Sequence, residues 1–167
     1  MASGQMKCTE NVYYQARKEA ALYNDKLNSR EGAAELLGIS VSSLADYELG
    51  MTKFVPVDKV RLMADLYNAP QLMNGYCKYE CPLGQHRILP TKVESVELST
   101  VKFINAIDQI DLKKIQSRLT AIACNGVIDE DEKEDFFEIV EQLNKVQEQI
   151  ERLKLLAGKI GGADNVK

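Results

Sequence analysis

The stretch from Ser29 to Gly50, SREGAAELLGISVSSLADYELG, constrains the fold of this chain more than any other. Its apolar residues fall at helical spacing in two short runs, separated by Gly38, Ile39 and Ser40. Glycine can end a helix with a positive φ angle, and a serine hydroxyl can accept a backbone N–H from the first turn of the next helix. The stretch therefore predicts two short helices joined by a tight turn, with Ile39 buried in the turn and Gly50 closing the second helix.

Two helices around such a turn form the helix-turn-helix motif, whose second helix enters the major groove of DNA. The runs AAELLGIS, SSL and YELG, followed by Pro56 and KVRLMADLYNAP (residues 59–70), closely resemble the lambda-repressor-like, or XRE, family of bacterial and phage regulators. The resemblance covers residues 11–75. It implies a sequence-specific DNA-binding transcriptional regulator that places the Ser40–Gly50 helix in the major groove.

The resemblance also indicates which side chains would face DNA. Base readout usually relies on Arg, Lys, Asn or Gln, which form bidentate hydrogen bonds with bases, and the expected readout face of this chain has none of them. Phosphate contacts are implied for Arg30, where the family commonly has a glutamine, and for Lys53 after the second helix. The base-facing positions are Val41, Ser42, Ser43, Ala45 and Asp46.

A structural ion pair is implied as well. In the family, an arginine on the first helix bonds to a glutamate on the second helix of the motif, and the matching residues here are Arg17 and Glu48. Removing one partner of such a buried pair strands a charge and costs about 3–5 kcal/mol.

The residues before the motif are expected to form a flexible end over residues 1–9, then a helix over residues 10–24. A polar loop is expected over residues 24–29. Either Asn28 or Ser29 would cap the next helix, with Glu31 in capping-box spacing from Asn28.

A further helix, beginning at Pro56 or Val57 and ending over residues 68–70, is expected to complete the helix-turn-helix domain, residues 10–75. A short helical piece is expected over residues 72–76, and residues 76–90 read as a cysteine-containing connector. The buried face of the further helix is predicted to consist of Val60, Leu62, Met63, Leu66 and Tyr67.

Residues 91–167 are predicted to form a second helical region, with helices over residues 93–107 and 112–122 and a turn at Asn125–Gly126. Asp129 and Glu132 have capping-box spacing at the start of a long helix that runs to about Gly158. Its apolar residues alternate steps of three and four, as in a coiled coil or long helical hairpin. This apolar seam predicts that the long helix packs against the preceding helices and leaves some surface for dimerisation or for a protein partner. The residues of the seam are Phe136, Ile139, Leu143, Val146, Ile150, Leu153, Ala157 and Ile160.

Charge and composition limit the possible functions. The 167 residues carry a net charge of −4, but residues 1–90 hold 10 basic and 10 acidic side chains. The excess of acid lies in residues 91–167, so DNA binding must depend on local patches rather than on the overall field. No apolar run is long enough to span a membrane and no secretory signal is visible, so a reducing cytoplasmic setting is expected.

Metal and catalytic sites are not expected. Cys77, Cys81 and His86 would need Cys8 as a distant fourth zinc ligand, and buried cysteines in a connector are the simpler interpretation. The segment NGVIDEDE (residues 125–132) resembles part of a calcium loop, but alanines occupy its first and third ligand positions. No nucleophile and base pair stands out, so we expect neither an enzyme nor a cofactor.

The sequence thus predicts an all-α DNA-binding regulator that forms a homodimer through its C-terminal helices. The alternative is a protein-interaction adaptor with a vestigial helix-turn-helix, whose C-terminal helices bind a partner protein. A repressor that responds to a small molecule is a third possibility, without a pocket signature to support it.

Overall fold

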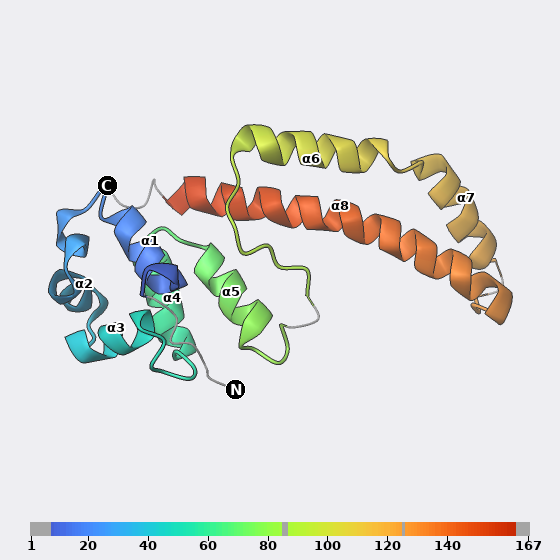
Figure 1. Cartoon of the computed structure of the whole chain (residues 1–167). Coiled ribbons are helices and arrows are strands. Elements are labelled where there is room, and N and C mark those ends of the chain that lie inside the picture. The colour runs from blue at the N-terminus through green and yellow to red at the C-terminus, as the bar shows by residue number, and fades with distance from the viewer. Residues whose placement is uncertain (1–7, 85–86, 125, 163–167) are drawn as a thin grey trace. The chain divides into compact units, whose positions relative to one another are not determined.

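The computed structural model describes residues 8–84, 87–124 and 126–162, and this part of the chain is helical with no strand (Figure 1). The predicted all-α fold is therefore confirmed. The chain divides into two compact units, one formed by residues 1–92 together with 157–167, the other by residues 93–156. Of the expected flexible end, residues 1–7 lie outside the described residues, and Cys8 and Thr9 belong to a short 3-10 helix.

The first unit is built from short helices. The first α-helix begins after Asn11, whose side chain accepts the backbone N–H groups of Tyr13 and Tyr14, so it is shorter at both ends than the predicted range of residues 10–24. The elements of this unit are η1 (Cys8–Glu10), α1 (Val12–Ala20), η2 (Asp25–Asn28), α2 (Arg30–Leu37), α3 (Val41–Glu48), α4 (Val57–Leu66) and α5 (Gln71–Tyr79).

The segment between α1 and α2 differs from the polar loop that we expected. It forms the 3-10 helix η2, and Leu27 within it is only 1% exposed, because it joins the apolar core. This η2 helix lies against the start of α2. A Cβ atom on Gly32 would lie 2.2 Å from the Lys26 carbonyl oxygen, so the close approach requires glycine at that position.

The turn between α2 and α3 follows the sequence prediction in most respects. Gly38 has a φ of 63° and ends α2, and the Ser40 hydroxyl accepts the Ser43 N–H at 3.0 Å. Ile39 is only partly buried. Ser29 caps α2 by accepting the Gly32 N–H at 3.1 Å, so the capping box between Asn28 and Glu31 was a wrong prediction.

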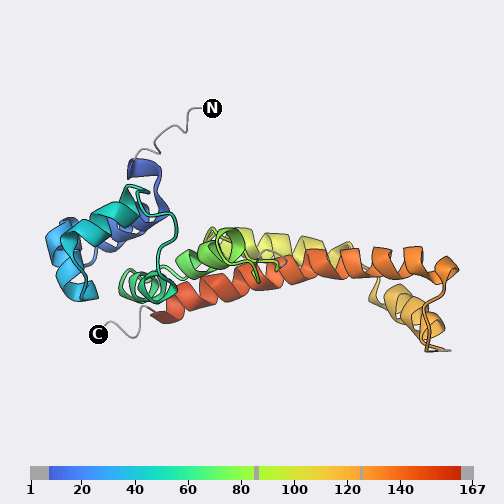
Figure 2. The ribbon, with the colours of Figure 1, turned by 90° about the horizontal axis from the view of Figure 1, so that it is seen from below.

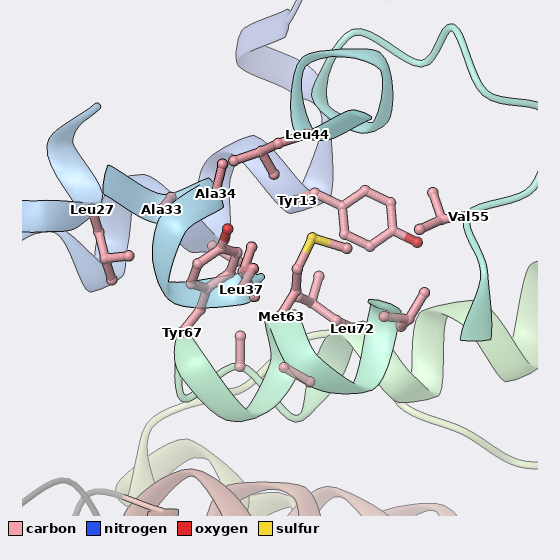
Figure 3. Close-up of a cluster of buried hydrophobic side chains, with 14 of the residues drawn as sticks. Tyr13, Leu27, Ala33, Ala34, Leu37, Leu44, Val55, Met63, Tyr67 and Leu72 are labelled. Carbon is pink, nitrogen blue, oxygen red and sulfur yellow. The ribbon is translucent and has the colours of Figure 1, made fainter. Parts of the chain in front are cut away.

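One apolar core holds these helices together (Figure 3). It contains Met63 of α4 and Tyr67 directly after α4, with Leu37 and Leu44 from the two helices of the motif and Leu72 from α5. Each large side chain buried in this way stabilises the fold by about 1.5–3 kcal/mol. On α4, Val60 and Met63 are buried as predicted, and so is Tyr67 directly after the helix. Leu66 is only partly buried, Leu62 is 42% exposed, and Ala64 is buried in the core.

The second unit contains α6 (Val96–Asp108), α7 (Leu112–Ile122) and the first part of α8 (Glu130–Gly162). The predicted capping box is present at the start of α8. The Glu132 N–H donates to Asp129 Oδ1 at 3.1 Å, and the Asp129 N–H donates to Glu132 Oε2 at 3.3 Å. Asn125 of the predicted turn lies outside the described residues, and Gly126 has a φ of 73°.

Helix α8 spans 33 residues and ends at Gly162, beyond the predicted end near Gly158 (Figure 2). Its predicted apolar seam is only partly covered, since Ile139 is fully buried while Leu143 and Ile150 are 40% and 39% exposed. The last turns of the helix belong to the first unit. There the Asn68 side chain donates to the Lys159 carbonyl at 2.9 Å.

The contact between η2 and α2 leads to a stability prediction. Gly32→Ala forces a methyl group against the Lys26 backbone, and we expect it to lower the free energy of unfolding by about 1–3 kcal/mol. Gly75→Ala is the matched control, because a Cβ atom there meets no atom within 4 Å. Because Gly75 lies within α5, Gly75→Ala should raise the free energy of unfolding by about 0.5–1 kcal/mol. Urea unfolding of both variants tests this, and similar changes in the two would contradict the role of Gly32.

Candidate nucleic-acid interface

Glu48, near the end of α3, is fully buried and bonded to two arginines. The Arg17 guanidinium donates to its carboxylate through Nε at 2.6 Å and Nη2 at 3.0 Å, and Arg30 Nε donates to it at 2.8 Å. Arg17 Nη1 also donates to the Leu27 carbonyl at 2.8 Å. A single buried guanidinium thereby joins α1, η2 and α3. The pairing of Arg17 with Glu48, which the family resemblance implied, is present in the structure.

Tyr67, directly after α4, lies beside this pair. Burial raises the pKa of its phenol above the usual value, and the negative charge of Glu48 raises the same pKa further, while Arg17 opposes both. Hydrogen bonding to Glu48 raises the pKa of Arg17, so the guanidinium keeps its charge at every physiological pH. Arg17 therefore places a permanent positive charge inside a largely apolar core, next to the Glu48 carboxylate.

The outward side of α3 presents the residues that the resemblance assigned to base readout. Val41 is 39% exposed, and Ser42 and Asp46 are also exposed, whereas Ser43 and Ala45 are partly buried. The structure thus brings all five residues together on one short helix. In chemical terms they offer methyl groups, hydroxyls and one carboxylate.

Three hydroxyls cluster at the beginning of α3. Ser40 Oγ lies 3.0 Å from Ser42 Oγ and 2.8 Å from Ser43 Oγ. A hydroxyl has one donor and two acceptor sites, so these contacts leave some hydrogen-bonding capacity for an external group. That capacity suits single hydrogen bonds to a phosphate or a base edge.

The two basic residues expected at phosphate differ in their surroundings. The side chain of Arg30 is 31% exposed and bonded to Glu48, so part of its hydrogen-bonding capacity serves the fold. Lys53, which follows α3, is exposed, and its Nζ lies 5.3 Å from the centre of the Phe54 ring. Of the two, Lys53 is the more accessible cation.

Acidic and apolar side chains are also exposed on α2, on α3 and in the segment after α3. Glu31, Glu35 and Asp46 are exposed on α2 and α3. Close to Lys53 in the chain lie large apolar residues whose exposure ranges from 43% to 67%, a feature that our sequence reasoning did not identify. Whether an apolar residue is buried depends on which segments pack over it, and the local sequence pattern does not show which segments these are. These exposed residues are Leu49, Met51, Phe54 and Val57.

A second polar group lies at the end of α5. Glu80 is partly buried, and one of its carboxylate oxygens has no hydrogen-bond partner in the structure. Burial raises the pKa of Glu80, while a hydrogen bond with the Val55 backbone partly opposes this rise. The carboxylate also contributes, after burial, to the raised pKa of Tyr13. Glu80 therefore connects α5 to the segment that precedes α4.

The alternative sites considered from sequence receive no geometric support. Among the described residues, no three side chains of the His, Cys, Asp and Glu types come together as a metal site would require, and His86 lies outside those residues. Cys77 lies on α5 rather than in an irregular connector. No helix in the described ranges combines the length and apolar character that a membrane crossing requires.

Comparison of the chain with family models, with curated proteins and with solved structures gives no match. The resemblance to the lambda-repressor-like family therefore stays a prediction made from the sequence motifs alone.

Loss of the buried carboxylate tests the role of the ion pair. We expect Glu48→Ala to lower the free energy of unfolding by about 3–5 kcal/mol, because it strands the Arg17 charge in the core. Glu35→Ala removes an exposed carboxylate from α2 and serves as the matched control, with an expected change within about 0.5 kcal/mol. Thermal unfolding measures both changes, and a Glu48→Ala midpoint equal to that of the wild type would show that the pair is dispensable.

Glu80 predicts a pH dependence of stability. Because its pKa is raised in the folded state, its favourable contribution is complete below the unfolded pKa of about 4.3 and is lost as pH rises through the folded pKa. Glu80→Gln removes this titration and keeps an oxygen for the Val55 N–H. The variant should unfold at a higher temperature than the wild type at pH 7 and at a similar temperature near pH 4. A difference in midpoint that does not vary with pH would contradict the assignment.

Proposed function

We propose that this protein is a DNA-binding transcriptional regulator that docks α3 in the major groove and acts as a dimer. The observation that carries the proposal is the bonding of Glu48 at the end of α3 to Arg17 on α1, which fixes α3 against the core while its outward side stays accessible. A recognition helix needs this combination, because base contacts require a helix presented at a defined angle.

The chemistry of the exposed side defines what kind of DNA reader this would be. Val41 and Ala45 suit contact with a thymine methyl group, and Ser42 suits a single hydrogen bond to a base or phosphate. Asp46 would repel phosphate and could accept a hydrogen bond from a cytosine amino group. With few strong base contacts, we expect modest affinity and a preference that depends partly on DNA shape.

Dimerisation would compensate for a weak single contact. Two copies of α3 would address half-sites about 34 Å apart, one turn of B-DNA. The expected operator is therefore an inverted repeat whose half-sites have centres about one helical turn apart. Regulation of transcription would follow from occupancy of such a site.

The second candidate function is a protein-interaction adaptor. It is favoured by the absence of Arg, Lys, Asn and Gln from α3 and by the exposed acids Glu31 and Glu35 on α2 and Asp46 on α3. A nucleic-acid surface is normally basic. In this case the apolar side chains exposed on the helices of the second unit would bind a partner protein.

Selection of bound duplexes from a random DNA pool at moderate salt separates the two functions. Enrichment of an inverted repeat with half-sites about one turn apart is the result expected of a dimeric DNA reader. Failure to enrich any sequence, with only weak and salt-sensitive binding, would overturn the DNA proposal and favour the adaptor.

Lys53 provides a sharper test on the selected duplex. Lys53→Ala should weaken binding by a similar factor on matched and mismatched duplexes and reduce the slope of log affinity against log salt by about 1. Lys78→Ala is the matched control, since Lys78 is likewise exposed and lies 5.6 Å from the ring of a neighbouring aromatic residue, Tyr79. Equal losses in the two variants would mean that Lys53 acts only through net charge.

A further inference from the structure

The end of α8, residues 157–162, is the part of this helix that belongs to the first unit. Three of these residues, Gly158, Gly161 and Gly162, are glycines, which destabilise a helix relative to alanine. None of residues 157–162 is buried, so little apolar contact offsets that weakness. The local sequence and its burial therefore do not explain why this end of α8 is helical.

A contact with Asn68, in the connection between α4 and α5, provides the explanation. The Asn68 side chain donates from Nδ2 to the Lys159 carbonyl at 2.9 Å, and Lys159 Nζ donates to the Asn68 carbonyl. The last four carbonyls of a helix have no partner within it, and the Lys159 carbonyl is one of these because α8 ends at Gly162. Asn68 thus caps the end of α8 from a segment 91 residues away in the sequence.

Asn68 also ends α4, and that role does not require its amide. It has a φ of 47°. Its N–H donates to the Asp65 carbonyl at 3.3 Å, and the Ala69 N–H donates to the Ala64 carbonyl at 2.8 Å. These bonds form a Schellman motif, in which the residue with positive φ is usually glycine and sometimes asparagine. A glycine would therefore end α4 as well, and the amide of Asn68 serves the contact with α8.

The two glycines nearest the end of α8 have different surroundings. A Cβ atom on Gly162 would lie 2.3 Å from Asn68 Oδ1, whereas a Cβ atom on Gly161 would meet no atom within 4 Å. The Asn68 amide can rotate away from a methyl group at position 162, but it then loses its hydrogen bond to Lys159. The contact between Asn68 and α8 therefore requires glycine at position 162 and tolerates alanine at position 161.

We propose that residues 157–162 form a C-terminal strap that closes on the connection between α4 and α5 and opens while the rest of the first unit stays folded. The Asn68 amide holds the closed state, since its bond to Lys159 caps the helix. On opening, the strap loses its helical structure, because its glycines favour the unfolded chain and no buried side chain opposes the change. The strap is a conformational device beyond the proposed function, and it does not depend on DNA binding.

Hydrogen exchange of the full chain without DNA, followed for individual amides by NMR, tests the strap. In the wild type the amides of residues 157–162 should exchange faster than those around Met63 in the core, because opening the strap does not require unfolding of the unit. Asn68→Gly removes the amide and suits the positive φ that ends α4. It should speed exchange in the strap about fivefold, the effect of one hydrogen bond, and leave the core amides unchanged.

Alanine at the two neighbouring glycines provides a matched pair. Gly161→Ala should slow exchange in the strap about fivefold, because alanine favours the helix. Gly162→Ala brings a similar gain but displaces the Asn68 amide, so exchange should be about fivefold faster than in Gly161→Ala. In the Asn68→Gly background the obstacle is absent, and Gly162→Ala should then slow exchange as Gly161→Ala does.

Three outcomes would overturn the proposal. Strap amides that exchange at the same rate in Asn68→Gly as in the wild type would indicate ordinary fraying of a helix end. Strap and core amides that lose protection together would make the end of α8 a fixed part of the first unit. Equal effects of Gly161→Ala and Gly162→Ala in the wild-type background would show that Asn68 does not hold the strap.

Discussion

The first unit depends on the ion pair between Glu48 and Arg17. Both groups are almost completely shielded from water, with side-chain exposures of 0% and 3%, and removing a charge from water costs several kcal/mol. The pair is therefore a weak source of net stability. Its effect is on geometry, because each charge is satisfied only when α1, η2 and α3 adopt one arrangement. A packing error that shifted α3 would leave a buried charge without its partner, so the pair selects one orientation of α3.

In that orientation, the exposed side of α3 has fewer basic side chains than a DNA-binding surface usually has. Glu48 attracts Arg30 as well as Arg17, which draws one of the few cations near α3 toward the core. The side chains on the outward side of α3 are small, apolar or acidic, and Lys53, which follows the helix, is an exposed cation. If α3 enters a major groove, as we propose, affinity would have to come from shape, backbone contacts and the presence of a second copy. The weakness of such a single contact is the reason that our proposal includes a dimer.

The second unit follows a different principle. Its helices are long, its buried apolar residues are few, and polar groups such as Ser99 and Glu94 lie partly unsatisfied where α6 meets α8. Ion pairs orient its helices, among them Arg118 of α7 with Asp135 and Glu138 of α8. Hydrogen bonding to these two carboxylates raises the pKa of Arg118. Such ion pairs fix how one helix is aligned along the next, and they leave apolar side chains of these helices exposed.

Local patterns in the sequence determined the helices and their caps. Gly38, Ser40 and the pair Asp129–Glu132 act within one turn of helix, so their roles could be predicted without knowledge of the fold, and the all-α class followed from helical spacing. Tertiary structure decided what long-range neighbours control. Leu27 is buried and Leu62 exposed because of what packs over them, and Arg30 is drawn to Glu48 across 18 residues of sequence. The exposure of Val101 and Ile104 on α6 likewise depends on which side of the helix packs against α8, and the sequence does not reveal that side because α6 has apolar residues on both.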